Sequence, residues 1–426
     1  MATLDVEKAR SHFPILSSGF IFADNAGGSQ AAKEVVDMIS DYLLNTNVQL
    51  GADYSFGVKS TTRVLVDGPR EAAKLFNARY PDEVVFGSSS TLNLENLARG
   101  LEKDIHPGDE FIITGEHEAN VGPWKKLAIR KDAVIKHWRP TPTIPDNPYS
   151  VKLKIEELLP LITSKTRIVA ITACSNVLGS IVPVKEVVKA IREEAKRKGS
   201  EKVEISVDCV AYAPHRLIDV QDWDVDFCTF SFYKVYGPHI SGMYVRASVL
   251  EHSISSIVHH FIKADKVAYK LQPGGPGYEI VYGATGVIPY LLSLTPHNDL
   301  KESFKAIAAH EQTLIEPLLS FLTDPVQRER GVRVVGEETV NLDRVPTISF
   351  VVVGQRPIKS KTIVGVFDKK GGIGIRYGHF YAHTLIDELS PKLDTNDGVV
   401  RISLVHYNTV EEVHKIIAVL KEIFEA

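Results

Sequence analysis

The chain has 426 residues, of which 44% are hydrophobic and 24% charged, and its formal net charge is −4. This length is too great for one simple core, so we expect one large and one smaller domain. The slightly acidic balance argues against nucleic acid or an anionic membrane as the main partner, and no apolar stretch approaches the length of a membrane span.

The three cysteines, Cys174, Cys209 and Cys228, show no paired spacing. They form neither a disulfide framework nor a zinc site, and we expect no metal site in this chain. All three fall in or near predicted strands, where we expect small buried side chains. The N-terminus has no basic region followed by an apolar run, so we expect no signal peptide and a reducing, cytoplasmic compartment.

The first hundred residues alternate between helical and strand-like patterns. A short amphipathic arm is predicted for 1–20, followed by a short strand at 21–23 and a glycine-containing turn. Helical patterning occupies 31–44. Its apolar residues are predicted to share one face: Val35, Val36, Ile39, Tyr42 and Leu43. A second helical stretch ends at 72–76.

A serine-rich turn follows the next predicted strand, 83–86, and leads into helical sequence at 92–101. Backbone N–H groups and hydroxyls at a helix N-terminus can cradle a phosphate, and Ser88 and Ser89 are the candidates here. The alternative is a serine-rich helix cap without a ligand. The turn by itself leaves both interpretations open.

The alternation continues as far as residue 234. Further strands are predicted at 110–114, 133–138, 167–172, 203–207 and 227–230, helices at 121–131 and 184–198, and a proline-rich loop at 139–149. Strands separated by helices indicate an α/β fold with a mainly parallel sheet covered on both sides. In such sheets ligands bind beyond the carboxyl ends of the strands.

Polar side chains stand at several of these strand ends, so one pocket can collect them: Ser88, His117, Asn176, Asp208 and Lys234. An acid and a lysine at nearby strand ends are what pyridoxal 5′-phosphate (PLP) chemistry requires. The lysine holds the aldehyde as a Schiff base, and the carboxylate keeps the pyridine nitrogen protonated. A lysine after a strand is more often a solvated surface residue, so the prediction depends on the rest of the chain.

The chain changes character after Lys234. A loop rich in glycine and proline is predicted at 271–278, helices at 285–294, 300–322 and 363–369, and strands at 346–353 and 398–404. Thr409-Val410-Glu411-Glu412 is typical of a capping box opening the last helix. The predicted domains are therefore an arm at 1–20, a large PLP-binding domain at 21–285 and a small α+β domain at 286–426.

Several segments, in order, resemble the motifs of fold-type I PLP enzymes of the class-V aminotransferase superfamily, in particular the cysteine desulfurase/selenocysteine lyase branch. They are Asp24-Asn25-Ala26-Gly27, Glu116-His117 with Ala119, Ser175-Asn176-Val177-Leu178-Gly179, Val207-Asp208, Ser231 with Lys234 and Gly237-Pro238, Arg376 with Gly378-His379, and Arg401-Ile402-Ser403 with Tyr407-Asn408-Thr409. The resemblance spans residues 24–413. It implies the PLP-transferase fold type I, a PLP cofactor, an amino-acid substrate and a homodimer.

The resemblance also implies roles for the candidate residues. Lys234, His117 and Asp208 are the implied catalytic residues: the lysine anchors the cofactor and moves the Cα proton, and the histidine stacks on the pyridine ring. The implied cofactor contacts also include Ser88, Ser89, Asn176, Ser231 and Tyr233. The implied substrate contacts are Arg401, whose planar fork matches a carboxylate, and Asn176, Arg376, His379 and Asn25.

The sequence departs from the desulfurase pattern at several positions. Tyr381 stands where those enzymes carry the cysteine that takes sulfur as a persulfide, and a tyrosine cannot accept sulfur. Ala211 replaces a glutamine that contacts the cofactor, and Tyr233 replaces a histidine before the lysine. The segment 278–285 matches the family's cross-subunit phosphate loop only with an insertion, which leaves that contact open.

Three functions are therefore weighed. The first is a carbon–sulfur lyase that eliminates the β-substituent without a persulfide cysteine. The second is an aminotransferase or other PLP carbanion enzyme acting on a specialised amino acid. The third, a PLP-binding protein without turnover, is disfavoured because all parts of a catalytic site are present. One fold hosts many PLP reactions, so the fold does not separate the first two.

Overall fold

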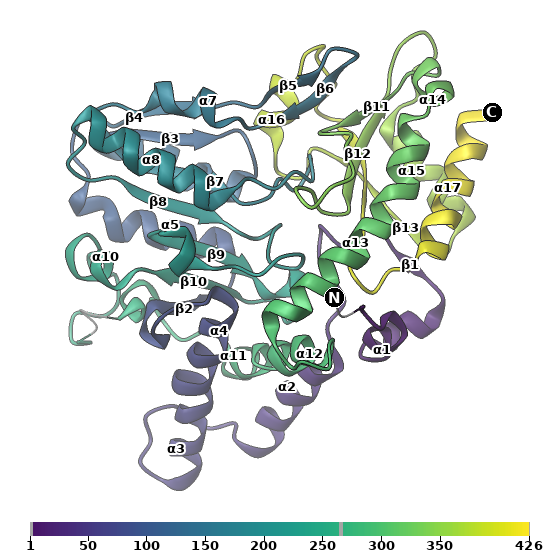
Figure 1. Ribbon diagram of the computed structural model, residues 1–426. Coiled ribbons are helices and arrows are strands. Elements are labelled where there is room, and N and C mark those ends of the chain that lie inside the picture. Colours follow the sequence, from purple (N-terminus) through teal and green to yellow (C-terminus); the bar gives the residue numbers. More distant parts are fainter. Residues whose placement is uncertain (1–2, 264–266, 426) are drawn as a thin grey trace.

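A seven-stranded sheet forms the centre of the computed structural model, which describes residues 3–263 and 267–425 (Figure 1). Its strand order is β2-β10-β9-β8-β7-β3-β4, and β10 alone runs antiparallel to its neighbours. The strands are β2 Val84–Gly87, β3 Glu110–Thr114, β4 Val134–Trp138, β7 Thr166–Thr172, β8 Glu204–Asp208, β9 Phe227–Ser231 and β10 Ser241–Val245. The predicted mainly parallel α/β sheet is confirmed. Residues 1–2 of the predicted arm and 426 of the predicted small domain lie outside the described residues.

Helices cover both faces of this sheet, because successive strand residues point to opposite sides. Ile112 and Val169 pack in one core with α8 (Val184–Lys198). Their neighbours Phe111 and Ile168 pack in the other core with α5 (Ser90–Leu101) and α6 (Gly122–Lys131). The strands are thus buried on both sides, which explains their continuous apolar runs.

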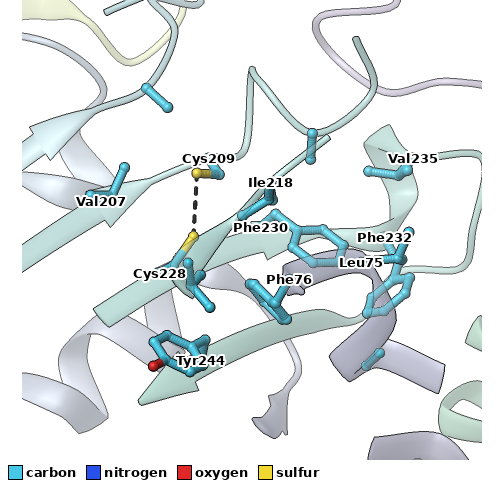
Figure 2. Packing of buried hydrophobic residues seen from close by; sticks show 14 of the residues in the cluster. Leu75, Phe76, Val207, Cys209, Ile218, Cys228, Phe230, Phe232, Val235 and Tyr244 are labelled. Atoms are coloured by element: carbon cyan, nitrogen blue, oxygen red, sulfur yellow. Dashed lines mark hydrogen bonds between the residues drawn. The ribbon is translucent and has the colours of Figure 1, made fainter. Parts of the chain in front are cut away.

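Aromatic packing lies directly beneath the turn that follows β9 (Figure 2). The ring centroids of Phe76 and Phe230, and those of Phe230 and Phe232, lie 4.8 Å apart. Burying a phenylalanine side chain contributes about 1.5–3 kcal/mol each, so this cluster fixes the backbone of the turn η7 (Phe232–Lys234). Cys209 and Cys228 meet in the same cluster with their sulfurs 3.3 Å apart. All three cysteines are buried, as predicted.

A second, antiparallel sheet has the order β11-β12-β15-β14. Its strands are β11 Val332–Val335, β12 Thr347–Val352, β14 Arg376–Gly378 and β15 Val399–Ser403, and it packs against α13 Leu300–Thr323, α15 Ser360–Lys370 and α17 Val410–Glu425. The predicted capping box is confirmed: the Glu412 N–H donates to Thr409 Oγ1 over 3.2 Å, and the Thr409 N–H donates to Glu412 Oε2 over 3.3 Å. This unit matches the predicted smaller α+β part.

The N-terminal segment crosses to the second sheet. After α1 (Val6–Ser11) and η1 (Pro14–Ser18), strand β1 (Ile21–Phe22) pairs in parallel with β13 (Ile373–Gly374). Ile21 packs in the core of the second sheet, whereas α12 (Val287–Ser293) packs in a core of the first. The domain boundaries at residues 21 and 286 stay predictions, and these contacts cross both of them.

Several elements differ from expectation. The predicted loop 139–149 contains most of a β-hairpin, β5 Thr141–Ile144 and β6 Asn147–Lys152. Helix α12 lies within the helix predicted at 285–294, which is confirmed, and α11 (Tyr278–Ala284) is an additional helix that was not predicted. In α2 (Lys33–Asn45) the predicted apolar face is only partly buried, with Val36 and Leu43 51% and 46% exposed.

The remaining elements are short. They are α3 Ser55–Thr61, η2 Thr62–Asp67, α4 Gly68–Phe76, η3 Pro81–Glu83, η4 Glu102–Asp104, η5 Glu118–Asn120, α7 Ile155–Leu158, η6 Leu159–Leu161, α9 Val220–Trp223, α10 Ala247–His252, η8 Ala268–Leu271, α14 Pro325–Glu329 and α16 His383–Glu388. Within the described ranges, no helix combines the length and the apolar character needed to cross a membrane.

Candidate active site

A pocket of about 500 Å³ collects half of the predicted site residues. It is lined by Ala26, Gly27, Thr91, Glu95, His117, Glu118, Ala119, Gly122, Pro123, Lys126, Asn176, Tyr233, Lys234, Arg376, Phe380, Tyr381 and Arg401. The lining residues up to Lys234 come from the turn after β1, helices α5 and α6, the turns η5 and η7 and the loop after β7, and the last four come from β14, β15 and the loop after β14. The site therefore lies where the two sheets face each other.

Lys234 is buried at the end of η7, one turn beyond β9. Burial lowers the pKa of its ammonium to about 8, the positive charge of Arg401 adds to that effect, and the carboxylates of Asp208 and Asp24 oppose it. To the residues that the structure describes, its ammonium makes no hydrogen bond or ion pair. A buried amine of this kind is a nucleophile and a base near neutral pH.

Asp208 ends β8, the strand beside β9. It is buried and is not among the lining residues, and its Oδ1 accepts a hydrogen bond of 2.9 Å from the Val210 N–H. Burial raises the pKa of its carboxyl, while that hydrogen bond and the charge of Lys234 oppose the rise. A cationic group placed beside Asp208 would favour the carboxylate further.

His117 lies at the start of η5, after β3. Its Nδ1 accepts a hydrogen bond of 3.2 Å from the Ala119 N–H, so the neutral ring carries its proton on Nε2. Burial lowers the pKa of this histidine to about 3, and the positive charges of Lys234 and Arg401 lower it further. The pocket thus presents a neutral imidazole.

Arg401 is buried on β15 and is held from three sides. It donates to Asp24 Oδ1 over 2.8 Å and to the Asn176 carbonyl over 3.1 Å, and its guanidinium lies 3.7 Å from the Phe380 ring centroid. Two buried atoms in this wall, Arg401 Nε and Asn176 Oδ1, have no partner among the described residues. Buried polar groups almost always have a hydrogen-bond partner, so these two unpartnered atoms indicate that a polar ligand binds here.

The other predicted site residues do not line the pocket. Ser89 accepts a hydrogen bond of 3.1 Å from the Leu92 N–H as the cap of α5, and Ser88 is exposed. Ser231 contacts Ser90 over 2.6 Å. The Asn25 amide donates to the Phe22 carbonyl over 2.7 Å. Asp208 and His379, whose ring nitrogen accepts from the Tyr381 N–H, also lie outside the lining. The functional assignments of all the predicted site residues stay predictions.

Three residues outside the predicted set also shape the site. Asp24 bridges the two pocket arginines, with Oδ1 on Arg401 and Oδ2 3.3 Å from Arg376. Glu116 is buried, accepts from Ser175 Oγ over 2.7 Å, and has a pKa raised to about 7 by burial. Phe380 supports Arg401. Asp24 and Glu116 stand in motifs with a visible sequence signal, whereas Phe380 carries none.

Comparisons with known proteins agree with this architecture. The family model of aminotransferase class V matches residues 21–416. An aminotransferase-like protein of Gibberella zeae is 40% identical over 99% of this chain and 98% of its own length, and a cysteine desulfurase-like protein of Aspergillus flavus is 31% identical over 99% and 91%. Cysteine desulfurases of Thermococcus onnurineus and Escherichia coli share the fold, with TM-scores of 0.82 and 0.80 at 23% and 22% identity; the alignments cover 100% and 99%, respectively, of both chains.

The matched range contains every predicted site residue, and the fold is shared with solved desulfurases over nearly the whole chain. Both the sequence motifs and the fold therefore lead to one assignment. The chain belongs to the class-V aminotransferase family and has cysteine desulfurase-like relatives.

Proposed function

We propose that this protein is a PLP-dependent enzyme acting on an amino acid, and that its reaction is the β-elimination of a sulfur substituent without a persulfide cysteine. The observation that carries the proposal is a single pocket that holds a buried lysine, a neutral histidine and a buried arginine, Lys234, His117 and Arg401. The family to which the chain belongs supports the cofactor.

The residues present fit PLP. Lys234 would hold the aldehyde carbon, Asp208 would face the ring nitrogen, and His117 would stack on the ring. The orphaned Asn176 Oδ1 and Arg401 Nε leave polar positions for the cofactor or the substrate carboxylate. When bound, PLP supplies a ring that takes up the electron pair released at Cα.

The protein's own contribution is to bind, orient and move a proton. Arg401 offers the free edge of its guanidinium to a carboxylate, and Phe380 and Asp24 keep it from turning away. Because the pKa of Lys234 is lowered to about 8, its amine is partly neutral near pH 7 and can take the Cα proton. Because the His117 imidazole is neutral, with Nδ1 unprotonated, it does not repel a cation in the pocket.

The residues that line the pocket determine whether the sulfur released from the substrate can be bound by the protein. No cysteine lines the pocket, and all three cysteines are packed in the interior. Burial raises the pKa of the Cys174 thiol, which makes it a poor nucleophile at neutral pH. Tyr381 occupies the loop position after His379 and Phe380. Sulfur leaving the substrate therefore has no thiolate acceptor in the pocket.

A product assay tests this proposal. With cysteine or cystine as substrate, we expect sulfur to appear in solution together with pyruvate and ammonia in equal amounts, because the C–S bond breaks and nothing reduces the remaining carbon skeleton. Alanine in stoichiometric yield, with sulfur bound to Cys174 or Cys209 in peptide mass spectra, would contradict the proposal. The control is a parallel reaction without protein but with free PLP.

The second candidate is transamination, favoured by the aminotransferase-like name of the relative that is 40% identical. The same product assay distinguishes transamination from elimination. A transaminase yields one keto acid per bound cofactor and stops until another keto acid is supplied, whereas a lyase continues to turn over. Dependence of turnover on added keto acid would therefore replace elimination with transamination.

We also propose a homodimer. Exposed apolar side chains occur on α2, the following loop, α3 and η2, elements that lie at the lower end of the molecule in Figure 1. They are Val36, Leu43, Leu44, Tyr54, Phe56, Val58, Leu65 and Val66, which we call the α2–η2 surface. Each of these side chains is at least 45% exposed, with Leu44 82% exposed. Large exposed apolar patches mark interaction sites, and a second copy of the chain is the partner that the family favours.

Replacing Leu44 by aspartate should dissociate the dimer. In a symmetric interface the change occurs twice, and at about 1–3 kcal/mol for each poorly paired polar group the two copies together cost roughly 2–6 kcal/mol. Sedimentation at several protein concentrations measures the dissociation constant. Ile129→Asp, an equally exposed site on α6, is the matched control and should leave association unchanged. A wild-type monomer, or an unaltered dimer in Leu44→Asp, would refute this interface.

A further inference from the structure

Tyr381 makes a contact that crosses the pocket. Its ring centroid lies 5.5 Å from that of His117, with the two planes inclined at 36°. Tyr381 comes from the loop between β14 and α16, whereas His117 follows β3 of the large sheet. The two halves of the site thus meet through these rings. The proposed function uses Tyr381 only as a side chain that cannot carry sulfur.

The backbone beneath this contact is strained and held from both sides. Phe380 and Tyr381, with φ of 50° and 61°, are consecutive non-glycine residues in the left-handed region, which such side chains avoid. The Asn176 amide donates to the Phe380 carbonyl over 2.9 Å, and the Glu118 N–H donates to the Tyr381 carbonyl over 2.8 Å. Strain that the surroundings maintain in this way is characteristic of functional sites.

The Tyr381 ring lies against His117 in the wall of the pocket, and it is itself open to solvent. Tyr381 as a whole is 67% exposed, and one part of its ring packs against the imidazole. The positive charges of Lys234 and Arg401 disfavour protonation of His117. The other charged groups that line the same pocket are Glu118, which adjoins His117 in sequence, and Glu95, Lys126 and Arg376. Loss of hydration at the ring is the larger influence on the pKa of His117. The packing that shields the imidazole from water therefore lowers the pKa of His117 more than the neighbouring charges do.

We propose that Tyr381 is a positioning residue whose ring covers the outer side of His117 and keeps the imidazole neutral, with Nδ1 unprotonated, in one orientation. The role needs the aromatic ring and not the hydroxyl. The contact between the two rings is present in the chain itself. The proposal rests on the proposed function only in assuming that His117 contacts PLP when the cofactor is bound.

The test compares Tyr381→Asn with Tyr381→Phe in the full-length protein without added cofactor. Asparagine tolerates the left-handed backbone and removes the ring, so the variant keeps the loop conformation. The His117 titration is followed by NMR of ring-labelled histidine, with its signal assigned by His117→Gln. Tyr377→Leu, on the same loop's strand but outside the pocket wall, is the matched control.

We expect wild type, Tyr381→Phe and Tyr377→Leu to keep His117 neutral between about pH 5 and pH 8. In Tyr381→Asn the pKa should move toward the ordinary 6.5, an about tenfold or larger change in the protonation equilibrium. An unchanged titration in Tyr381→Asn would overturn the proposal, and so would a Tyr381→Phe variant that titrates like it. Failure of the protein to take up PLP would refute the proposed function and leave this result unaffected.

Discussion

Lys234→Ala should abolish covalent attachment of PLP and nearly all turnover. The amine is the buried group in the pocket that can bond the aldehyde, and its loss as a proton acceptor alone costs about 10²–10⁴-fold in rate. Borohydride reduction followed by peptide mapping should find the pyridoxyl group on Lys234 in the wild type and on no residue in the variant. Labelling of another lysine in the wild type would show that the anchor is misassigned.

Two further variants and the pH dependence of PLP uptake test the same assignment of Lys234. Lys234→Arg keeps a cation but cannot supply a neutral amine, so it should fail like alanine, whereas Lys185→Ala on the exposed side of α8 should behave as wild type. Because burial lowers the pKa of Lys234 to about 8, the neutral amine gains as pH rises through that value. The rate of PLP uptake should rise through pH 8 and level off above it. A rise only near 10.5, the ordinary value, would contradict a buried amine.

The alternation of patterns predicts the large sheet because each of its strands is buried on both faces and therefore carries a continuous apolar run. Helix α8 is found at 184–198, where it was predicted, since its apolar residues recur at helical spacing. The β5–β6 hairpin was missed because Pro142 and Pro148 suggested a loop. The pairing of β1 with β13 joins residues about 350 positions apart, and no local pattern reports such a contact.

Part of the candidate site was predictable because residues follow strands, and Tyr233, Arg376 and Arg401 were predicted from the family motifs. His117, Asn176 and Lys234 stand at strand ends, and parallel topology brings them to one pocket. The contacts that hold the Arg401 guanidinium in place were not predictable, because Asp24 lies 377 positions away in the sequence and Phe380 contacts the guanidinium through its ring. The exposure of Val36 and Leu43 also escaped prediction, since a helical apolar stripe does not show whether its own chain or a second copy covers it.

Arg401→Ala should weaken substrate binding by about 2–5 kcal/mol, the range for removing one partner of a buried hydrogen-bonded charge pair. That corresponds to roughly 30- to 5,000-fold in the dissociation constant. PLP content should be nearly unchanged, because Lys234 is intact. The measurement is a titration of the bound cofactor's absorbance with amino acid, and thermal melting of both proteins checks that the fold survives the loss of the Asp24 contact.

Two comparisons give this prediction its specificity. Arg376→Ala removes the half-exposed neighbour that also contacts Asp24, and an exposed ion pair contributes only about 0–1 kcal/mol, so its effect should be far smaller. Arg401→Lys keeps the charge but not the planar fork and should stay defective. Amines that lack the carboxylate should bind wild type and Arg401→Ala equally weakly. If wild type binds such amines as tightly as the parent amino acids, Arg401 does not hold the carboxylate, and the orphaned Nε must serve another ligand atom.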